Sequence, residues 1–401
     1  MTNNQDKLNP EAIARQVDEL FVEYDAKTLG YLDIAVIGKV SSGKSSFLNA
    51  FFSCSKNEPK FTVGATSGTT INVNSQNLGE HIRIIDTPGL GDIKKENVEI
   101  TNAFINKNID IGIMIIEGSV TQSGLENYEL LKKSTSNIFV VMNKIDTVSK
   151  ENLADIKTQW RSALMLDPNT EIYELSCRGY DLKDKIVDPI TGEEKEIPVD
   201  EYGVPKTIRG IKKLQEDIFF VCFKIGKVAF IAKQVAQKQV AAMGIIAAAC
   251  AASVGSILLP GSIAFILATQ TTAISSLGFL YRGNFPSKAE VAEILKIFTT
   301  TNAQTVGALA YGIFVSFMPP TGVFDIGGII IVVSYMATTL LIVNFFFSKG
   351  LEIKKTVGLN HEFERINKSL RKSVATADIR EIANINFWTK LLSQVNITIE
   401  N

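Results

Sequence analysis

Residues 38–45 read GKVSSGKS, a complete G-x-x-x-x-G-K-[ST] motif. The apolar run 31–37 (YLDIAVI) comes directly before it, and the helical pattern 46–50 (SFLNA) comes directly after it. A strand, a glycine-rich turn and a helix in this order predict a loop whose backbone N–H groups bind nucleotide phosphates, assisted by the helix dipole. The residues predicted to contact the nucleotide here are Gly38, Lys39, Val40, Ser41, Ser42, Gly43, Lys44, Ser45 and Ser46.

Within this loop, two side chains have distinct predicted roles. Lys44 would reach the β- and γ-phosphates as a point charge, and the Ser45 hydroxyl would coordinate Mg²⁺. The loop therefore predicts a nucleotide with a bound magnesium ion.

The chain has 401 residues, 41 of them basic and 42 acidic, which gives a formal net charge of −1. This balance provides no global field to attract nucleic acid, so we expect no nucleic-acid partner. The cysteines, at positions 54, 177, 222 and 250, form no metal or redox spacing and indicate reduced thiols in the cytosol. The polar N-terminal residues show no secretory signal.

Apolar residues are unevenly distributed and divide the chain. Residues 239–281, 297–324 and 326–348 contain no Asp, Glu, Lys or Arg, whereas residues up to about 225 mix charges with apolar runs. We therefore predict an N-terminal helix within 1–30 that packs on the helical module, an α/β domain over 31–225, and a hydrophobic all-α domain over 226–401.

In the first half, near-continuous apolar runs alternate with helical patterns at 125–134 and 151–165. This is typical of a mostly parallel sheet buried on both faces by helices. Residues 69–78 alternate more and predict an antiparallel edge strand paired with 81–87. A polar insert at about 181–206 carries turn signals and predicts a small hairpin. A helix from about residue 207 would close the domain.

Further short motifs fall where strands end, which is where open α/β sheets bind ligands. In residues 86–89 (DTPG), Asp86 would hold Mg²⁺ through water and the Gly89 N–H would sense the γ-phosphate. In residues 66–70 (TSGTT), Thr70 or Thr69 would complete the magnesium shell.

The two remaining motifs predict recognition of guanine. In residues 143–146 (NKID), Asp146 would accept hydrogen bonds from the guanine N1–H and amine, Lys144 would lie over the base, and Asn143 would hold the loop together. In residues 176–178, Ser176, Cys177 and Arg178 form a loop whose backbone N–H would donate to guanine O6.

The five motifs GKVSSGKS, TSGTT, DTPG, NKID and SCR occur in order over residues 38–178. In this the chain resembles the Era/TrmE-like branch of the small GTP-binding proteins. The resemblance implies a P-loop G domain that binds GTP or GDP with Mg²⁺ and hydrolyses GTP. The layout, with helices before and after the G domain, is similar to that of the immunity-related GTPases.

The catalytic residue of hydrolysis is not assigned by the sequence. Ras-like relatives carry a glutamine just after the DxxG glycine that orients the attacking water. Here Leu90, Gly91 and Asp92 follow Gly89, so Lys44 and Thr70 stand as supporting groups only. We expect a low intrinsic rate that a homodimer, a cation or an activating partner raises.

Two interpretations of the second half stay open. In the first, the apolar segments of about 240–348 associate with membrane lipid while the G domain is cytoplasmic, because segments of roughly 20 residues can cross a bilayer. In the second, they form the buried core of a soluble scaffold module with little intrinsic hydrolysis. Small and polar residues suit the second interpretation, and residues 327–347, apolar on every face, suit the first.

Overall fold

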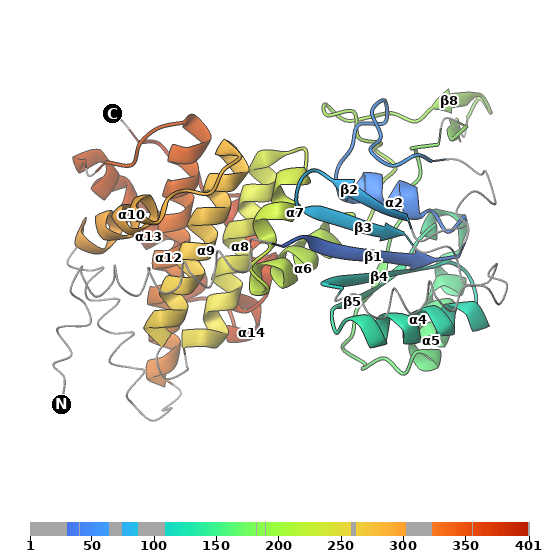
Figure 1. The fold of residues 1–401 in the computed structure, drawn as a ribbon, viewed down its shortest axis with the longest axis horizontal. Coiled ribbons are helices and arrows are strands. Elements are labelled where there is room, and N and C mark those ends of the chain that lie inside the picture. The colour runs from blue at the N-terminus through green and yellow to red at the C-terminus, as the bar shows by residue number, and fades with distance from the viewer. Residues whose placement is uncertain are drawn as a thin grey trace. The chain divides into compact units, whose positions relative to one another are not determined.

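The computed structural model describes residues 30–39, 41–63, 74–86, 109–181, 183–188, 190–257, 262–301, 323–354 and 356–399. These residues fall into two compact units (Figure 1). The first comprises Tyr31–Gln215 with the short segment Gln234–Ala236, and the second contains Glu216–Lys233 and Gln237–Asn401. The N-terminal helix predicted within residues 1–30 lies, apart from Gly30, outside the described residues.

A six-stranded sheet in the order β2-β3-β1-β4-β5-β6 forms the centre of the first unit. All neighbours are parallel except β2 and β3, which pair antiparallel with Leu78 opposite Ile82. This confirms the predicted α/β class and the antiparallel edge. The strands are β1 (Leu32–Gly38), β2 (Asn74–Leu78), β3 (Ile82–Asp86), β4 (Ile111–Ile116), β5 (Ile138–Met142) and β6 (Ile172–Glu174).

Helices cover both faces of this sheet, and Figure 1 shows α2 (Lys44–Phe51) on one face with α4 (Gln122–Ser134) and α5 (Lys150–Ala163) on the other. On the second face, Trp160 of α5 is 2% exposed and packs with Met114 and Val140. Its indole N–H donates to the Gly118 carbonyl at 2.8 Å. Burial of each large apolar side chain contributes about 1.5–3 kcal/mol, so this layer holds the strand ends in place.

The polar insert forms the small hairpin predicted for it. Strands β7 (Lys185–Val187) and β8 (Glu194–Glu196) pair antiparallel, and the Asp188 carboxylate accepts hydrogen bonds from the Ile190 and Thr191 N–H groups in the turn. Helix α6 (Ile211–Lys224) follows, a few residues after the predicted start at 207.

Helix α6 begins in the first unit and ends in the second. The division between the units falls after Gln215, inside this helix. The apolar pattern put the domain boundary at residues 225 and 226, where the chain leaves α6. The division comes earlier because the second half of α6 packs against the helices of the second unit. The Phe219 ring of α6 lies so close to Gly244 that a Cβ there would be 2.9 Å from it.

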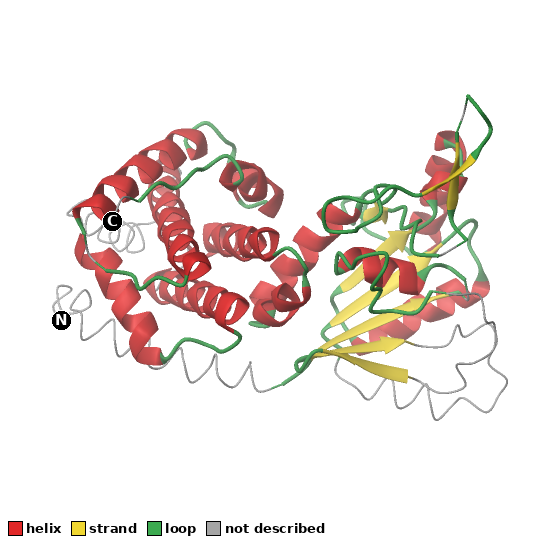
Figure 2. Ribbon diagram, turned by 90° about the horizontal axis from the view of Figure 1, so that it is seen from above, coloured by secondary structure: helices red, strands yellow, loops and turns green. Residues whose placement is uncertain are grey.

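All regular secondary structure among the described residues of the second unit is helical, with loops between the helices (Figure 2). Helices α8, α9 and α12 pack on one another, and α12 also packs on α13. The Ser253 hydroxyl on α8 donates to the Met336 thioether on α12 at 2.9 Å. The helices are α7 (Val228–Gln234), α8 (Lys238–Ile257), α9 (Ser262–Arg282), α10 (Lys288–Thr301), α12 (Val323–Lys349), α13 (Val357–Val374), α14 (Ile379–Ile382) and α15 (Ile385–Leu392).

Among the described helices, one stretch of α12, Ile326–Lys349, is long and apolar enough to span a bilayer by length and composition alone. Its most apolar window is nevertheless 78% buried within the structure. Helix α12 is apolar on every face because neighbouring helices cover it, as Val333, Met336 and Leu340 illustrate with 0% exposure each.

Candidate functional site

The loop between β1 and α2 makes a tight turn that depends on a glycine in the left-handed conformation. Gly43 adopts a left-handed φ of 86° as the N-cap of α2, and the Phe47 N–H donates to its carbonyl at 2.8 Å. The Ser42 N–H donates to the Lys39 carbonyl at 3.1 Å. This tight turn lies directly before the first turn of a helix, where unpaired N–H groups make a site for anions.

Close contacts require glycine at both ends of the loop. A Cβ on Gly38 would lie 2.7 Å from the Ile115 carbonyl of β4, and one on Gly43 would lie 2.5 Å from the Asn143 side-chain nitrogen. Real Cβ atoms do not approach other atoms so closely. The loop is therefore seated against β4 and against Asn143.

Lys44 extends back over the loop from the first turn of α2. Its Nζ donates to the Gly38 carbonyl at 3.0 Å and to the Lys39 carbonyl at 3.4 Å. The ammonium group is thereby held at the rim of the loop. Ser45 and Ser46, both half-buried, follow it in the same helical turn.

Asn143 joins two loops that are a hundred residues apart in sequence. Its side-chain amide N–H donates to the Ser42 carbonyl at 2.9 Å, and its backbone N–H donates to the Ile116 carbonyl at 3.0 Å. The residue is 4% exposed. Asn143 thus links the loop after β5 to a backbone carbonyl of the phosphate loop.

Asp146 and Ser176 come together at the ends of β5 and β6. The Ser176 hydroxyl, on a residue that is 1% exposed, donates to Asp146 Oδ1 at 2.7 Å, whereas Asp146 itself is exposed. The Ile145 N–H donates to the Leu175 carbonyl at 3.2 Å and fixes the two loops together. An exposed carboxylate oriented by a buried hydroxyl is suited to accept hydrogen bonds from a ligand.

Lys144 has a partner that the sequence pattern did not indicate. It adopts a left-handed φ of 61°, and its Nζ lies 2.6 Å from the Glu117 carboxylate. Glu117 follows the last residue of β4 directly, so its position at a strand end was the signal that could have singled it out. The ion pair holds the Lys144 side chain over the edge of the sheet.

Cys177 and Arg178 differ in their environments. Burial, followed by the nearby Asp146 carboxylate, raises the pKa of the Cys177 thiol to about 12, so it stays protonated and unreactive at neutral pH. The Arg178 side chain points toward the insert, where it donates to the Lys185 carbonyl and lies 3.8 Å from Asp184. The contact predicted for this loop therefore rests on its backbone N–H groups and not on these two side chains.

The structure describes part of the predicted magnesium set. Asp86 is the last residue of β3 and pairs in register with Val36 of β1, so its backbone lies at the same sheet edge as the phosphate loop. The remaining predicted site residues lie outside the described residues: Val40, Thr69, Thr70, Gly89, Leu90, Gly91 and Asp92.

Comparisons with known proteins agree with this geometry. Residues 33–144 match the family described as 50S ribosome-binding GTPase. The first unit, the GTPase domain, has the P-loop GTPase fold. The matched residues contain the phosphate loop, Asn143 and Lys144.

Curated relatives carry related names. GTPase Der from Sulfurihydrogenibium sp. (strain YO3AOP1) is 25% identical over 173 residues, 40% of this chain and 38% of that protein. GTPase Era from Ruminiclostridium cellulolyticum is 26% identical over 162 residues, 37% of this chain and 51% of that protein. The tRNA modification GTPase MnmE from Campylobacter curvus is 30% identical over 155 residues, 36% of this chain and 34% of that protein. The chain spans about a third to a half of these relatives' length.

Among solved structures, Toc33 from Arabidopsis thaliana in complex with GDP and Mg²⁺ is 16% identical with a TM-score of 0.33. The similarity covers 54% of this chain and 93% of that one.

We expect Gly43→Ala to lower the affinity of the GTPase domain for GDP by about tenfold or more, because an L side chain is strained at this φ and displaces Asn143. Titration with a fluorescent GDP analogue measures the change. Gly192→Ala is the matched control: Gly192 also has a positive φ, of 69°, but nothing lies within 4 Å of its Cβ position. Equal affinity in both variants would contradict the role given to the Gly43–Asn143 contact.

Proposed function

We propose that this protein binds GTP and GDP at the edge of the sheet and hydrolyses GTP, and that its nucleotide state controls the helical unit. The observation that carries the proposal is the hydrogen bond from Asn143 to the Ser42 carbonyl. It fastens the phosphate-binding loop to the loop that bears Asp146. A nucleotide, with phosphates at one end and a base at the other, requires these two loops to lie at a fixed separation.

Recognition of guanine is assigned to Asp146. Guanine presents two adjacent donors, N1–H and the exocyclic amine, which one carboxylate can accept together, and adenine lacks this pair. The Ser176 hydroxyl orients the carboxylate through its 2.7 Å hydrogen bond. Lys144, held by Glu117, would cover the base with its aliphatic stem.

Magnesium fits the residues at the phosphate end. The Ser45 hydroxyl lies in the first turn of α2, and Asp86 ends the neighbouring strand, so both can offer the oxygen ligands that Mg²⁺ prefers. Thr70 or Thr69 would add a third oxygen. When bound, the ion would neutralise phosphate charge, and Lys44 would add a further positive charge at the same end.

Hydrolysis is proposed to be slow unless it is assisted. Leu90 stands near the place where Ras-like proteins carry a water-orienting glutamine, and its side chain cannot orient or deprotonate water. A second copy of the chain, a cation or an activating partner would supply the missing group. The proposed partners are guanine nucleotide, a second copy of the chain or an activating partner, and membrane lipid.

Membrane association of the helical unit is the proposed output, with the GTPase domain in the cytoplasm and contacts through residues about 240–348. The length and apolar composition of Ile326–Lys349 support it. A second candidate is a soluble GTP-dependent scaffold, which the 78% burial of the same helix favours. In that case α8, α9 and α12 form a permanent core.

Asp146→Asn should weaken GDP binding by about a hundredfold, because an amide cannot accept both guanine donors and a lost charged hydrogen bond costs about 1.5–3 kcal/mol. The variant should gain affinity for xanthine nucleotides, whose second carbonyl accepts from the new amide. Competition between GDP and XDP measures both changes. Asp155→Asn, an exposed carboxylate on α5, is the control and should behave as the native protein does. Unchanged GDP affinity in Asp146→Asn would refute the assignment.

Single-turnover GTP hydrolysis should be slow in dilute protein, because no side chain is assigned to orient the water. If a second copy supplies the missing group, the rate per molecule should rise with protein concentration and reach a plateau. The measurement follows phosphate release over a series of protein concentrations at saturating Mg²⁺. A constant, fast rate would contradict the proposal of assisted hydrolysis.

Extraction of cell membranes with alkaline carbonate tests the helical unit. The membrane proposal expects the full chain to remain in the washed pellet. Phe265→Lys on α9 with Ile326→Lys on α12, both at exposed apolar positions, should then release it, whereas the same change at the exposed Val357, outside residues 240–348, should not. Native protein found entirely in the supernatant, with a melting temperature independent of lipid, would instead support the soluble scaffold.

A further inference from the structure

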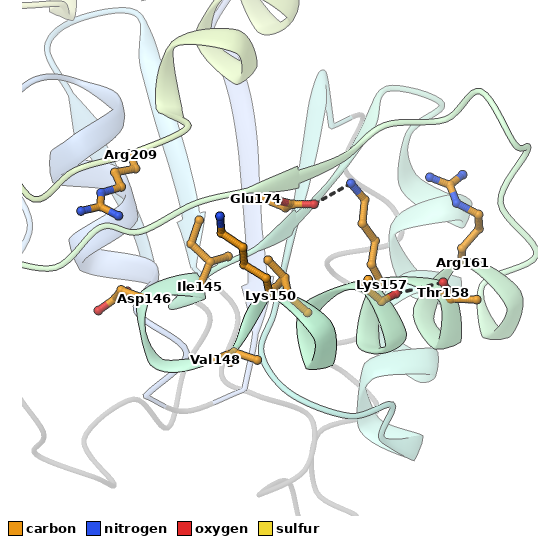
Figure 3. A pocket seen from close by; sticks show the side chains of 11 residues that line it. Ile145, Asp146, Val148, Lys150, Lys157, Thr158, Arg161, Glu174 and Arg209 are labelled. Carbon is orange, nitrogen blue, oxygen red and sulfur yellow. Dashed lines mark hydrogen bonds and ion pairs between the residues drawn. The ribbon is translucent and has the colours of Figure 1, made fainter.

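A cleft opens on the GTPase domain beside Asp146. It has a volume of about 660 Å³ and lies between α5 and the chain around β6 (Figure 3). The charged residues that line it are Asp146, Lys150, Lys157, Arg161, Glu174 and Arg209. The volume falls within the range of about 300–1,000 Å³ that small-molecule sites occupy.

The cleft is distinct from the place where the base would bind. Asp146 stands at the border and lines the cleft, but Asn143, Lys144, Ser176 and Cys177 do not. The rest of the lining comes from α5, from the segment just before it, from Glu174 of β6 and from Arg209, and none of these residues is assigned to nucleotide binding. A ligand could therefore occupy this cleft while a guanine nucleotide occupies the first site.

Positive charge prevails in the cleft. Its four cations and two carboxylates leave a formal surplus of two positive charges (4 − 2). Glu174 is paired with Lys157 at 2.8 Å, and the Asp146 carboxylate accepts a hydrogen bond from Ser176. The Ser176 hydroxyl is neutral, so Asp146 keeps its negative charge. The charges of Lys150, Arg161 and Arg209 are therefore opposed by this one carboxylate, which leaves the surplus of two.

The cations from α5 share one side of the helix. Lys150, Lys157 and Arg161 are seven and four residues apart, and Figure 3 shows their side chains extending from α5 in the same direction. They span about 16 Å along the helix axis. Between them, the small residues Ala154 and Thr158 leave the cleft open.

Backbone groups hold the Arg161 side chain and the Arg209 main chain in place. The Arg161 guanidinium donates to the Asp167 carbonyl at 2.7 Å and to the Thr170 carbonyl at 2.8 Å, which fix its position without neutralising its charge. The Arg209 backbone forms a two-way bridge with Ser176, with N–O distances of 2.9 and 3.2 Å. A preorganised cation loses less entropy when it binds an anion.

We propose that this cleft binds a small phosphorylated molecule, with Lys150 and Arg209 contacting its phosphate at the end near Asp146. An arginine fork and a lysine point charge together suit a phosphate group, and a surplus of two positive charges matches a doubly charged phosphate better than a single carboxylate. Arg161 would contact a second anionic group on the same molecule.

The site has a direct structural connection to nucleotide recognition. Arg209 is bridged through its backbone to Ser176, and the Ser176 hydroxyl holds the Asp146 carboxylate. A ligand bound to Arg209 is therefore connected through Ser176 to Asp146, the residue proposed to bind guanine. Any effect on guanine-nucleotide affinity must be reciprocal, because coupling between two binding sites is a shared free energy.

The test uses the full chain saturated with GDP, so that the phosphate loop is occupied. Isothermal titration with inorganic pyrophosphate, at constant free Mg²⁺, should show saturable binding. The double variant Lys150→Gln and Arg209→Gln should weaken it by about tenfold or more, since two charge-assisted contacts are lost. Lys133→Gln, an exposed lysine on α4, is the matched control and should bind as the native protein does.

Nucleotide retention, measured in the same samples, keeps this proposal separate from the function proposed above. If GDP does not bind, the proposed function fails. If GDP stays bound and pyrophosphate gives no saturable heat, the cleft proposal is overturned. It is also overturned if the double variant matches the control, or if an acidic peptide such as hexaglutamate binds more tightly than pyrophosphate. Melting temperatures of both variants should match the native value, because the replaced side chains are exposed.

Discussion

The hydrogen bond between the Asn143 side chain and the Ser42 carbonyl is the contact on which the candidate site depends. The loop with the phosphate-binding motif follows β1 and the loop with Asn143 and Asp146 follows β5, with β4 between those strands in the sheet. Parallel strands bring both loops to one edge, but they do not fix the distance between them. The amide does so, and it can approach because Gly43 has no side chain. The 2.7 Å bond from Ser176 then orients Asp146 within the same assembly.

The helical unit shows a conflict between its composition and its packing. Helix α12 is apolar on every face, yet the bundle also buries side-chain polar atoms that have no hydrogen-bond partner among the described residues. Gln270, Thr271 and Ser275 on α9 and Ser334 on α12 are of this kind. Each such group costs about 1–3 kcal/mol when it is buried without a partner. These helices therefore retain polar groups that a core selected only for stability would lack.

Much of the GTPase domain could be predicted from sequence because its signals are local. The order of strand, glycine-rich loop and helix predicted the phosphate site, and the alternating pattern of residues 69–78 predicted an antiparallel edge, which β2 confirms. The pairing of Lys144 with Glu117 was not predicted, because Glu117 follows β4 and Lys144 comes just after β5, and the two meet only when these strands pair. The cleft with Lys150 and Arg209 was missed for the same reason: 59 residues (209 − 150) separate these side chains along the chain.

The amino-acid sequence by itself determined the P-loop, its nucleotide chemistry and the change to an apolar second half, since each depends on residue types within a short window. Tertiary structure decided which residues hold the loops together, where the first unit ends and what covers α12. The division at Gln215 falls inside a continuous helix, and no local pattern marks it. It follows from which neighbours the two halves of α6 contact, and contacts between distant segments exist only once the chain has folded.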